Sequence, residues 1–187
     1  MAVIPESCSH RSPRNCTRRG LTLSLRISFG APVTMKSSAY LTMLDDSVTT
    51  LAARVAITDL LIGYFSALDS RDFDGVGSCF AEDGVMSTAE GKSGVGPLAV
   101  AEFVRRAASH FRTSTHHAAN IAITITDVGA DAETAATATL VLNEPAGMLR
   151  VRGLHYSDQL RHDPNGWRIV RRVHRAVWMY DVPGRSL

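Results

Sequence analysis

The sequence predicts an α+β fold in which a curved antiparallel sheet, shaped as a cone-like barrel, wraps over about three N-terminal helices. Two observations predict this class. The first half of the chain repeats apolar residues at spacings of three and four, which is typical of amphipathic helices. The second half holds long runs of β-branched and apolar residues with turn residues between them, which is typical of strands joined by hairpins.

The first predicted helix begins at a plausible N-cap, Asp46 or Ser47, and ends near Asp69. Asp and Ser favour this position because a side-chain oxygen accepts a hydrogen bond from a free backbone N–H of the first turn. The apolar stripe of this helix is formed by Leu51, Val55, Leu61, Tyr64, Phe65 and Leu68. We expect this stripe to face the sheet.

Two shorter helices follow. One is expected over residues 73–80, ending at Glu82-Asp83-Gly84, with a short strand over residues 85–87. A loop with several glycines leads to Pro97, which suits the first turn of a helix because proline has no N–H to leave unpaired. This third helix is expected to end at about Phe111.

Four strands are expected over residues 115–126, 133–143, 149–161 and 167–180. The segment Asp163-Pro164-Asn165-Gly166 is a strong hairpin signal between the last two. A sheet of this length buries its inner face by curling around the helices, and such a curved sheet leaves a conical pocket. The sequence therefore predicts a central cavity.

Composition narrows the classes of function. The chain has 187 residues, 45% hydrophobic and 20% charged, as expected for one globular domain. The net charge is only +2, and the basic excess lies near the N-terminus, so we expect no nucleic-acid partner. The three cysteines have no ligand or disulfide spacing, which predicts no metal site and favours a cytoplasmic location. No apolar run reaches membrane-spanning length, so no membrane partner is expected.

Residues 1–42 differ in composition from residues 43–187, which form the predicted domain. The first segment is rich in Arg and Ser and poor in acids. We interpret it as a disordered basic extension or as the product of an upstream start codon, with the true start at Met35 or Met43. A transit peptide has the same composition and is the alternative.

Asp69 and His116 are the candidate catalytic pair. Asp69 ends the first predicted helix, and His116 opens a predicted strand. If the fold brings them together, the carboxylate fixes the imidazole tautomer and leaves Nε2 free to accept a proton. Tyr64 lies about one and a half helical turns before Asp69, and its hydroxyl would need a partner if buried. Because alternate strand residues share a face, Asn120 is expected to point into the same cavity as His116.

Several short motifs follow one another along the chain. They are Tyr64 with Asp69, Phe80-Ala81-Glu82-Asp83, Gly96-Pro97, Thr115-His116 with Asn120, Tyr156 with Asp158, and Gly166-Trp167-Arg168-Ile169. Their order resembles the SnoaL-like group of the nuclear transport factor 2-like superfamily over about residues 45–180. The branch it is most similar to holds scytalone dehydratase, hexachlorocyclohexane dehydrochlorinase and bile-acid dehydratase. The resemblance implies an α+β cone with a central pocket and an Asp–His pair in it.

Carried over by residue, the resemblance implies that this pair falls on Asp69 and His116, and that the dehydratase tyrosine falls on Tyr64. An arginine that some members place in the pocket falls on Arg172, with the adjacent Arg171 as the alternative after a one-residue slip.

Two more residues are expected to bind substrate. They are Asn120 and Trp178, although a place in the core or in an interface is the alternative for Trp178. We find no match for a second catalytic histidine of the scytalone dehydratase type, because His110 falls on the third predicted helix.

These features predict a cofactor-independent lyase of the dehydratase type, in which the Asp–His pair is the general base for a small apolar or cyclic organic molecule. With no nucleophilic Ser or Cys and no metal site predicted beside the pair, its natural chemistry is abstraction of a C–H proton. A polyketide cyclase or isomerase with the same base is one alternative, and a non-catalytic ligand-binding or assembly module is another. An exposed face of long strands also favours a homodimer or homotrimer.

Overall fold

The computed structural model describes residues 24–25, 33–34 and 37–184. The chain divides into two compact units, Met1–Val48 and Thr49–Leu187. Most of the extension predicted over residues 1–42 lies outside the described residues. In its described part, two short strands pair antiparallel; they are β1 (Ser24–Leu25) and β2 (Val33–Thr34).

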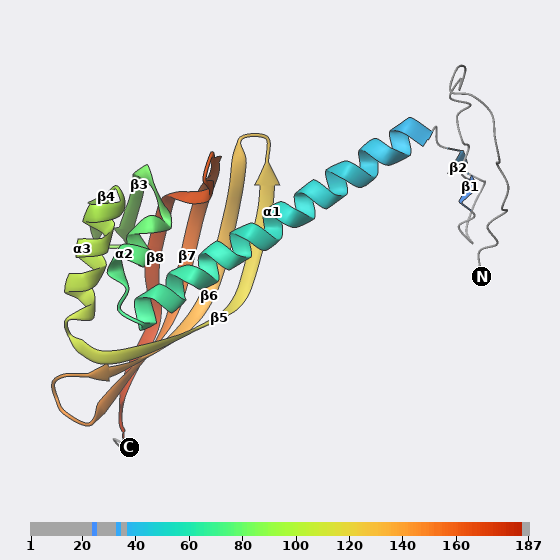
Figure 1. The fold of residues 1–187 in the computed structure, drawn as a ribbon. Helices are drawn as coiled ribbons and strands as arrows, with labels where there is room; N and C mark the ends of the chain where they lie inside the picture. Colours follow the sequence, from blue (N-terminus) through green and yellow to red (C-terminus); the bar gives the residue numbers. More distant parts are fainter. Residues whose placement is uncertain (1–23, 26–32, 35–36, 185–187) are drawn as a thin grey trace, which may run out of the picture. The chain divides into compact units, whose positions relative to one another are not determined.

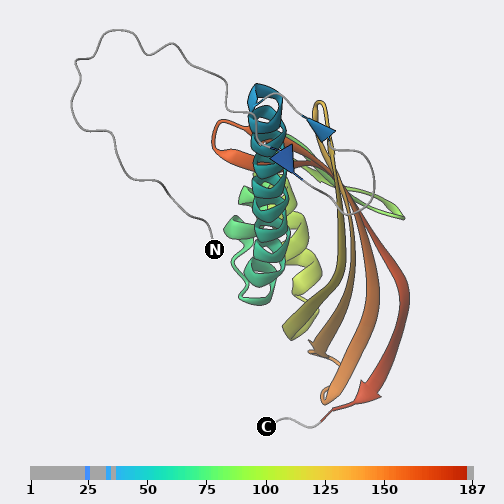
Figure 2. The ribbon, with the colours of Figure 1, turned by 90° about the vertical axis from the view of Figure 1, so that its right-hand side faces the viewer.

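A single mixed sheet and three helices make up the rest of the described chain. In chain order the elements are α1 (Ser37–Asp69), α2 (Phe73–Ser78), β3 (Phe80–Thr88), β4 (Gly91–Val95), α3 (Pro97–Ala108), β5 (Phe111–Thr126), β6 (Gly129–Leu142), β7 (Met148–Asp163) and β8 (Gly166–Pro183). The strand order is β4-β3-β8-β7-β6-β5. Within the second unit, the sheet curves around the C-terminal half of α1 and around α2 and α3 (Figures 1 and 2). The predicted α+β class is confirmed.

The last four strands form the predicted antiparallel meander, and β3 adds a parallel neighbour to it. Strands β5 to β8 pair in sequence order, each antiparallel to the next. Strand β3 pairs with β8 in parallel and with β4 antiparallel. Two parallel strands need a long crossover connection. Between β3 and β8 this connection consists of β4, α3 and the first three strands of the meander. The sheet is therefore mixed rather than purely antiparallel.

Helix α1 ends at Asp69 as predicted but begins at Ser37, earlier than the expected N-cap. No proline or glycine interrupts residues 37–46, so the helix continues through them. Its buried face also differs from the expected stripe. Leu51 and Val55 are exposed, and the side chains that reach the core are Ile57, Leu61, Tyr64 and Phe65.

The segment between α1 and α3 holds more strand than predicted. Helix α2 ends at Ser78, and β3 replaces the expected helix end and short strand. Strand β4 was expected to be a loop, because glycine is depleted in strands. Gly94 is needed there, since a Cβ at this position would lie 2.7 Å from the Ala99 backbone of α3. Helix α3 ends at Ala108, and Phe111 begins β5 instead of ending the helix.

By length and composition alone, residues 45–69 of α1 could cross a membrane. This differs from the sequence reading, which found no apolar run of that length. Core helices pass the same test, and the second half of α1 buries Ile57, Leu61 and Tyr64 in the core of the second unit. The absence of a membrane partner stays a prediction.

Candidate active site

Asp69 and His116 lie in hydrogen-bonding contact. The Nδ1 atom of His116 is 2.6 Å from Oδ1 of Asp69. The backbone N–H of His116 donates to Oδ2 of the same carboxylate at 2.7 Å, and the Ser114 hydroxyl donates to Oδ1 at 2.7 Å. Two donors and the imidazole Nδ1, all from one short stretch of β5, therefore contact the carboxylate at the end of α1.

Arg71 links the end of α1 to the start of β5. It adopts a positive φ of 60°, which ends the helix just after Asp69. Its guanidinium donates to the backbone carbonyls of Ala108 and Phe111, where α3 passes into β5. The turn that ends α1 thus also fixes the strand that carries His116.

The hydrogen bonds keep the Asp69 carboxylate ionised. Burial by itself raises the pKa of Asp69, but the hydrogen bonds from Ser114 and His116 together outweigh it, so that the pKa is lowered from its ordinary value. An ionised carboxylate at Nδ1 favours the tautomer that carries its proton there. The Nε2 atom is then the ring nitrogen that accepts a proton.

The imidazole of His116 is held in place by packing as well. Its side chain is only 6% exposed. Its ring stacks on that of Phe65 with centroids 5.6 Å apart and planes 19° apart. The aromatic contact fixes the plane of the ring, and Asp69 fixes its rotation within that plane.

A cavity of about 200 Å³ opens beside His116 between the helices and the sheet. Most of its wall is apolar, and its polar residues are few. It is lined by Tyr64, Leu68, Met86, Thr88, Phe103, Val104, Ala107, Ala108, Phe111, His116, Ala138, Leu140, Arg152, Leu154, Tyr156 and His174. An apolar pocket with a few convergent polar groups is the usual form of a small-molecule site.

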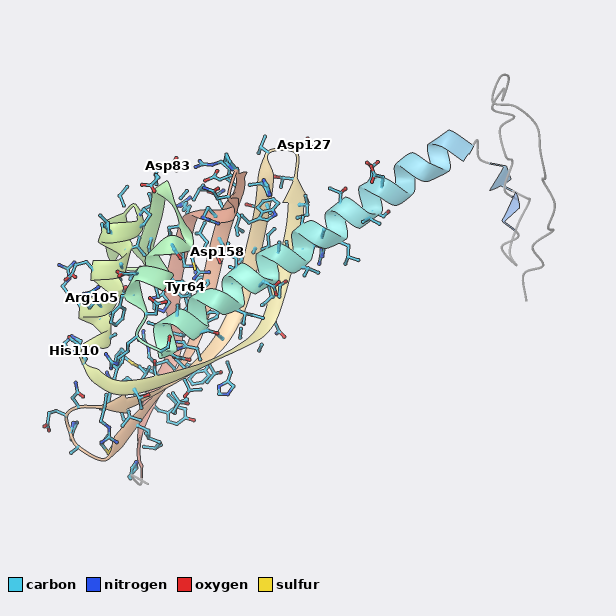
Figure 3. All side chains as sticks on the ribbon, viewed as in Figure 1. Tyr64, Asp83, Arg105, His110, Asp127 and Asp158 are labelled. Carbon is cyan, nitrogen blue, oxygen red and sulfur yellow. The ribbon has the colours of Figure 1, made fainter. Side chains whose placement is uncertain are left out.

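Tyr64 lines this cavity from α1, as predicted (Figure 3). Its hydroxyl donates to the sulfur of Met86 at 4.0 Å, and a thioether is a weak acceptor. Burial raises the pKa of the Tyr64 hydroxyl, although the Arg172 charge partly opposes this, so the group stays protonated at neutral pH. Tyr64 is therefore available as a hydrogen-bond donor to a ligand.

Asn120 does not share the cavity with His116, and the prediction that it does was wrong. Its side chain is exposed and does not line the cavity. A β-bulge explains the difference: Ala118 pairs with Ala136, whereas Asn120 pairs with Ala135, so one extra residue lies between them. The bulge reverses the alternation of β5, and Asn120 turns to the outer face.

Trp178 is also outside the cavity, contrary to expectation. The pairs Leu154–Ala176 and Gly153–Trp178 leave one extra residue on β8, which again reverses the alternation. The indole lies against Gly153, where a Cβ would be 2.2 Å from it, and stacks on the ring of Tyr180 with centroids 5.9 Å apart. Its side chain remains half-exposed on the outer face.

Arg172 is fully buried and paired, so it is not the free substrate anchor that the resemblance implies. Its Nε and one terminal nitrogen donate to the two carboxylate oxygens of Asp158, each at 2.7 Å. Its guanidinium also lies 4.1 Å from the centroid of the Tyr64 ring (Figure 3 labels Tyr64 and Asp158). Burial opposes the charge, but Asp158 outweighs it and raises the pKa of Arg172. The Arg172–Asp158 pair therefore packs against the Tyr64 ring and does not line the cavity.

Arg152 and His174 line the cavity and were missed from the sequence. Both lie on inward-facing positions of their strands, Arg152 two residues before Leu154 and His174 two residues after Arg172. The available signal was a basic residue at an inward position of an otherwise apolar strand face. Burial, followed by the charges of Arg152 and Arg172, lowers the pKa of His174 to about 4, so it is neutral at pH 7.

Among the described residues, no group of three or more His, Cys, Asp or Glu side chains is placed to hold a metal ion. The expectation that the protein needs no cofactor stays a prediction.

The curved sheet over helices, with an Asp–His pair at the wall of an apolar cavity, defines a class of small α+β proteins with a central ligand pocket. The chain belongs to the SnoaL-like domain family, which matches residues 49–173. Its fold is that of the nuclear transport factor 2-like proteins. The resemblance inferred from the short motifs is confirmed.

Known relatives locate the chain within this group. An uncharacterized protein of Mycobacterium tuberculosis, Rv2910c, is 29% identical over 134 residues, which cover 68% of this chain and 87% of the relative. A candidate scytalone dehydratase from Novosphingobium aromaticivorans has a TM-score of 0.66 at 22% identity, covering 75% of this chain and 94% of that one. Hexachlorocyclohexane dehydrochlorinase LinA-type3 from Novosphingobium barchaimii has a TM-score of 0.68 at 16% identity, covering 75% and 97%. At these identities, the two solved structures show the fold alone.

Proposed function

We propose that this protein is a cofactor-independent lyase of the dehydratase type, with His116 as the general base. The observation that carries the proposal is the 2.6 Å contact between His116 Nδ1 and Asp69 at the wall of an apolar cavity. A fixed, buried imidazole with a free Nε2 is suited to abstract a proton, which contributes roughly a hundredfold to ten-thousandfold to a rate.

The substrate is a small cyclic molecule with a carbonyl group. A cavity of about 150 Å³ binds benzene, so about 200 Å³ has room for one ring with substituents. A carbonyl makes the neighbouring C–H acidic enough for an imidazole to remove its proton. The mostly apolar wall favours the ring and excludes water.

In the proposed reaction, His116 Nε2 takes a proton from the carbon beside the carbonyl, and the electrons of the C–H bond form an enolate. Tyr64, which is protonated, donates a hydrogen bond to the developing oxyanion. The enolate then expels a hydroxyl group from the β-carbon. That hydroxyl leaves as water with the proton that His116 accepted, so protons and electrons balance.

The same base supports isomerisation or cyclisation through an enolate. Elimination is the favoured outcome because the structures of like fold include a dehydrochlorinase and a candidate dehydratase, which are named for eliminations. A ligand-binding or assembly module with the same fold is the non-catalytic alternative.

Exchange of carbon-bound protons in deuterated water tests the proposal directly. Cyclohexanone, 3-hydroxycyclohexanone and larger one-ring analogues are incubated with the protein, and deuterium uptake and loss of water are followed by mass spectrometry. We expect exchange with the wild type, and a loss of about a hundredfold or more with His116→Gln. His117→Gln is the matched control, since His117 is the next residue and lies on the exposed face. Equal exchange by wild type and His116→Gln would exclude His116 as the base.

A further inference from the structure

One row of residues crosses three adjacent strands at the cavity. His116 on β5 pairs with Ala138 on β6, and Ala138 pairs with Arg152 on β7. All three line the cavity. Neighbouring strands are about 4.8 Å apart, so the backbones that carry His116 and Arg152 are separated by roughly 10 Å. The small side chain of Ala138 leaves the space between them open.

Arg152 enters this cavity without a counter-ion. Its Nε atom is buried and has no hydrogen-bond partner among the described residues. Burial is also the main reason that the pKa of Arg152 is lowered. Arg152 as a whole is half-buried, but its Nε is fully buried, and a desolvated guanidinium nitrogen without an acceptor is costly.

The charges around Arg152 do not compensate it. Arg150 adds a positive charge, and the single carboxylate with a favourable effect, Glu90, is exposed on the turn between β3 and β4. His174 lines the same part of the wall and is neutral at pH 7. The other arginine near the cavity, Arg172, already has both its Nε and one terminal nitrogen on Asp158. Arg152 is thus the guanidinium in this wall that lacks a carboxylate partner among the described residues.

We propose that Arg152 is a substrate-binding residue that pairs with a carboxylate on the substrate ring, opposite His116. This inference rests on the proposed function and names its substrate class, a cyclic acid that carries both a ring carbonyl and a β-hydroxyl group. The carboxylate supplies the counter-ion that the folded chain lacks. A charge-assisted contact of this kind is about twice as strong as a neutral hydrogen bond, and a guanidinium binds a carboxylate through two parallel contacts.

The row also sets the orientation of the substrate. With its carboxylate at Arg152, the ring lies over Ala138 and presents its far side to His116 Nε2. The carbon that loses its proton is therefore on the side of the ring away from the carboxylate. Tyr64, on the helix side of the cavity, reaches the carbonyl oxygen between them.

Benzoate and benzamide are suitable probes, because they have one ring and nearly equal size and differ in charge. Binding to the full chain is measured by calorimetry, and the site is located by amide chemical-shift changes at His116, Ala138 and Arg152. We expect the wild type to prefer benzoate by about tenfold or more. Arg152→Gln should reduce this preference to within about twofold, and Arg152→Lys should retain part of it.

Arg150→Gln is the matched control. Arg150 lies two residues away on the same strand, but its guanidinium is exposed and paired with Asp181 through two contacts of 2.8 Å. This variant should keep the wild-type preference. Equal binding of the two probes by the wild type, an unchanged preference in Arg152→Gln, or shifts located away from the cavity would each overturn the proposal.

The binding assay does not depend on proton transfer. Asp69→Asn should bind benzoate at least as tightly as the wild type, because it removes a negative charge from behind the cavity wall, while it loses deuterium exchange. If the wild type exchanges deuterium normally but binds benzoate and benzamide equally, the substrate class alone is refuted. Normal benzoate binding without exchange by the wild type would refute the lyase proposal alone.

Discussion

At the scale of single residues, the site holds a proton acceptor, the imidazole of His116, in a rigid environment. Asp69 receives three hydrogen bonds and His116 is stacked on Phe65, so the base has one orientation. The buried pair of Arg172 and Asp158 has a different role, since it stabilises the ring of Tyr64 without touching the cavity.

Asp158→Asn should therefore lower the free energy of unfolding by about 3–5 kcal/mol, because it leaves the Arg172 charge buried and uncompensated. Urea unfolding followed by circular dichroism measures this change. Asp181→Asn breaks the exposed pair with Arg150 and should leave the free energy of unfolding almost unchanged. Similar small losses in both variants would contradict the structural role of the buried pair.

His174 makes the stability depend on pH. Its pKa is lowered from 6.5 to about 4 in the folded protein, so between these values the unfolded chain binds a proton that the folded chain does not. Stability should then decrease as the pH falls from about 6.5 to about 4, by no more than about 3.5 kcal/mol. In His174→Gln this part of the pH dependence should disappear. Parallel pH profiles for the two proteins would show that His174 titrates normally.

At the scale of elements, two glycines differ in the space around them: Gly94 of β4 lies against the backbone of α3, and Gly63 of α1 has open space. Gly94→Ala should destabilise the protein by about 1–3 kcal/mol, because the new methyl group would meet the α3 backbone. Gly63→Ala is the matched change on α1, where nothing lies within 4 Å, and it should stabilise by roughly 0.5–1 kcal/mol. Thermal unfolding of the two variants should shift in opposite directions, and a shift in the same direction would refute this reading.

Sequence patterns predicted most of the helices and strands but misplaced several side chains. Helical spacing and hairpin signals predicted α1, α3 and β5 to β8, and motif order predicted the contact between the end of α1 and β5. The same period of two placed Asn120 in the cavity, and Trp178 was also expected to bind substrate; both residues turn to the outer face after a bulge. A bulge depends on pairing between strands, which a single strand's pattern does not contain. The resemblance placed Arg172 in the pocket. The sequence pattern of β8 could not show that it pairs with Asp158, because Asp158 lies on a different strand.

At the scale of the whole molecule, the domain offers an apolar surface beyond the site. Two aromatic residues near the end of β8, Trp178 and Tyr180, are each about half-exposed and stack on each other on the outer face of the sheet. Strand β3 pairs with β8 only as far as His174, so this end of β8 has β7 as its one neighbour among the described strands. Such surfaces are typical of protein contacts.

The homodimer or homotrimer expected from the sequence stays a prediction, and sedimentation velocity tests it. We expect a dimer or trimer for the wild type and a smaller species for Tyr180→Glu, because a charge on the outer face would disrupt an apolar contact. Val128→Glu, on the exposed turn between β5 and β6, should sediment as the wild type does. A monomeric wild type would contradict the expectation.

The central claim is that Asp69 orients His116 as a base, and the ring tautomer of His116 tests it most directly. Nitrogen-15 NMR correlates the ring nitrogens with the carbon-bound ring protons and shows which nitrogen carries the proton. In the neutral imidazole of the wild type, the account predicts the proton on Nδ1, held by Asp69, and loss of this preference in Asp69→Asn. A wild-type ring with its proton on Nε2, or a tautomer indifferent to Asp69→Asn, would contradict the account.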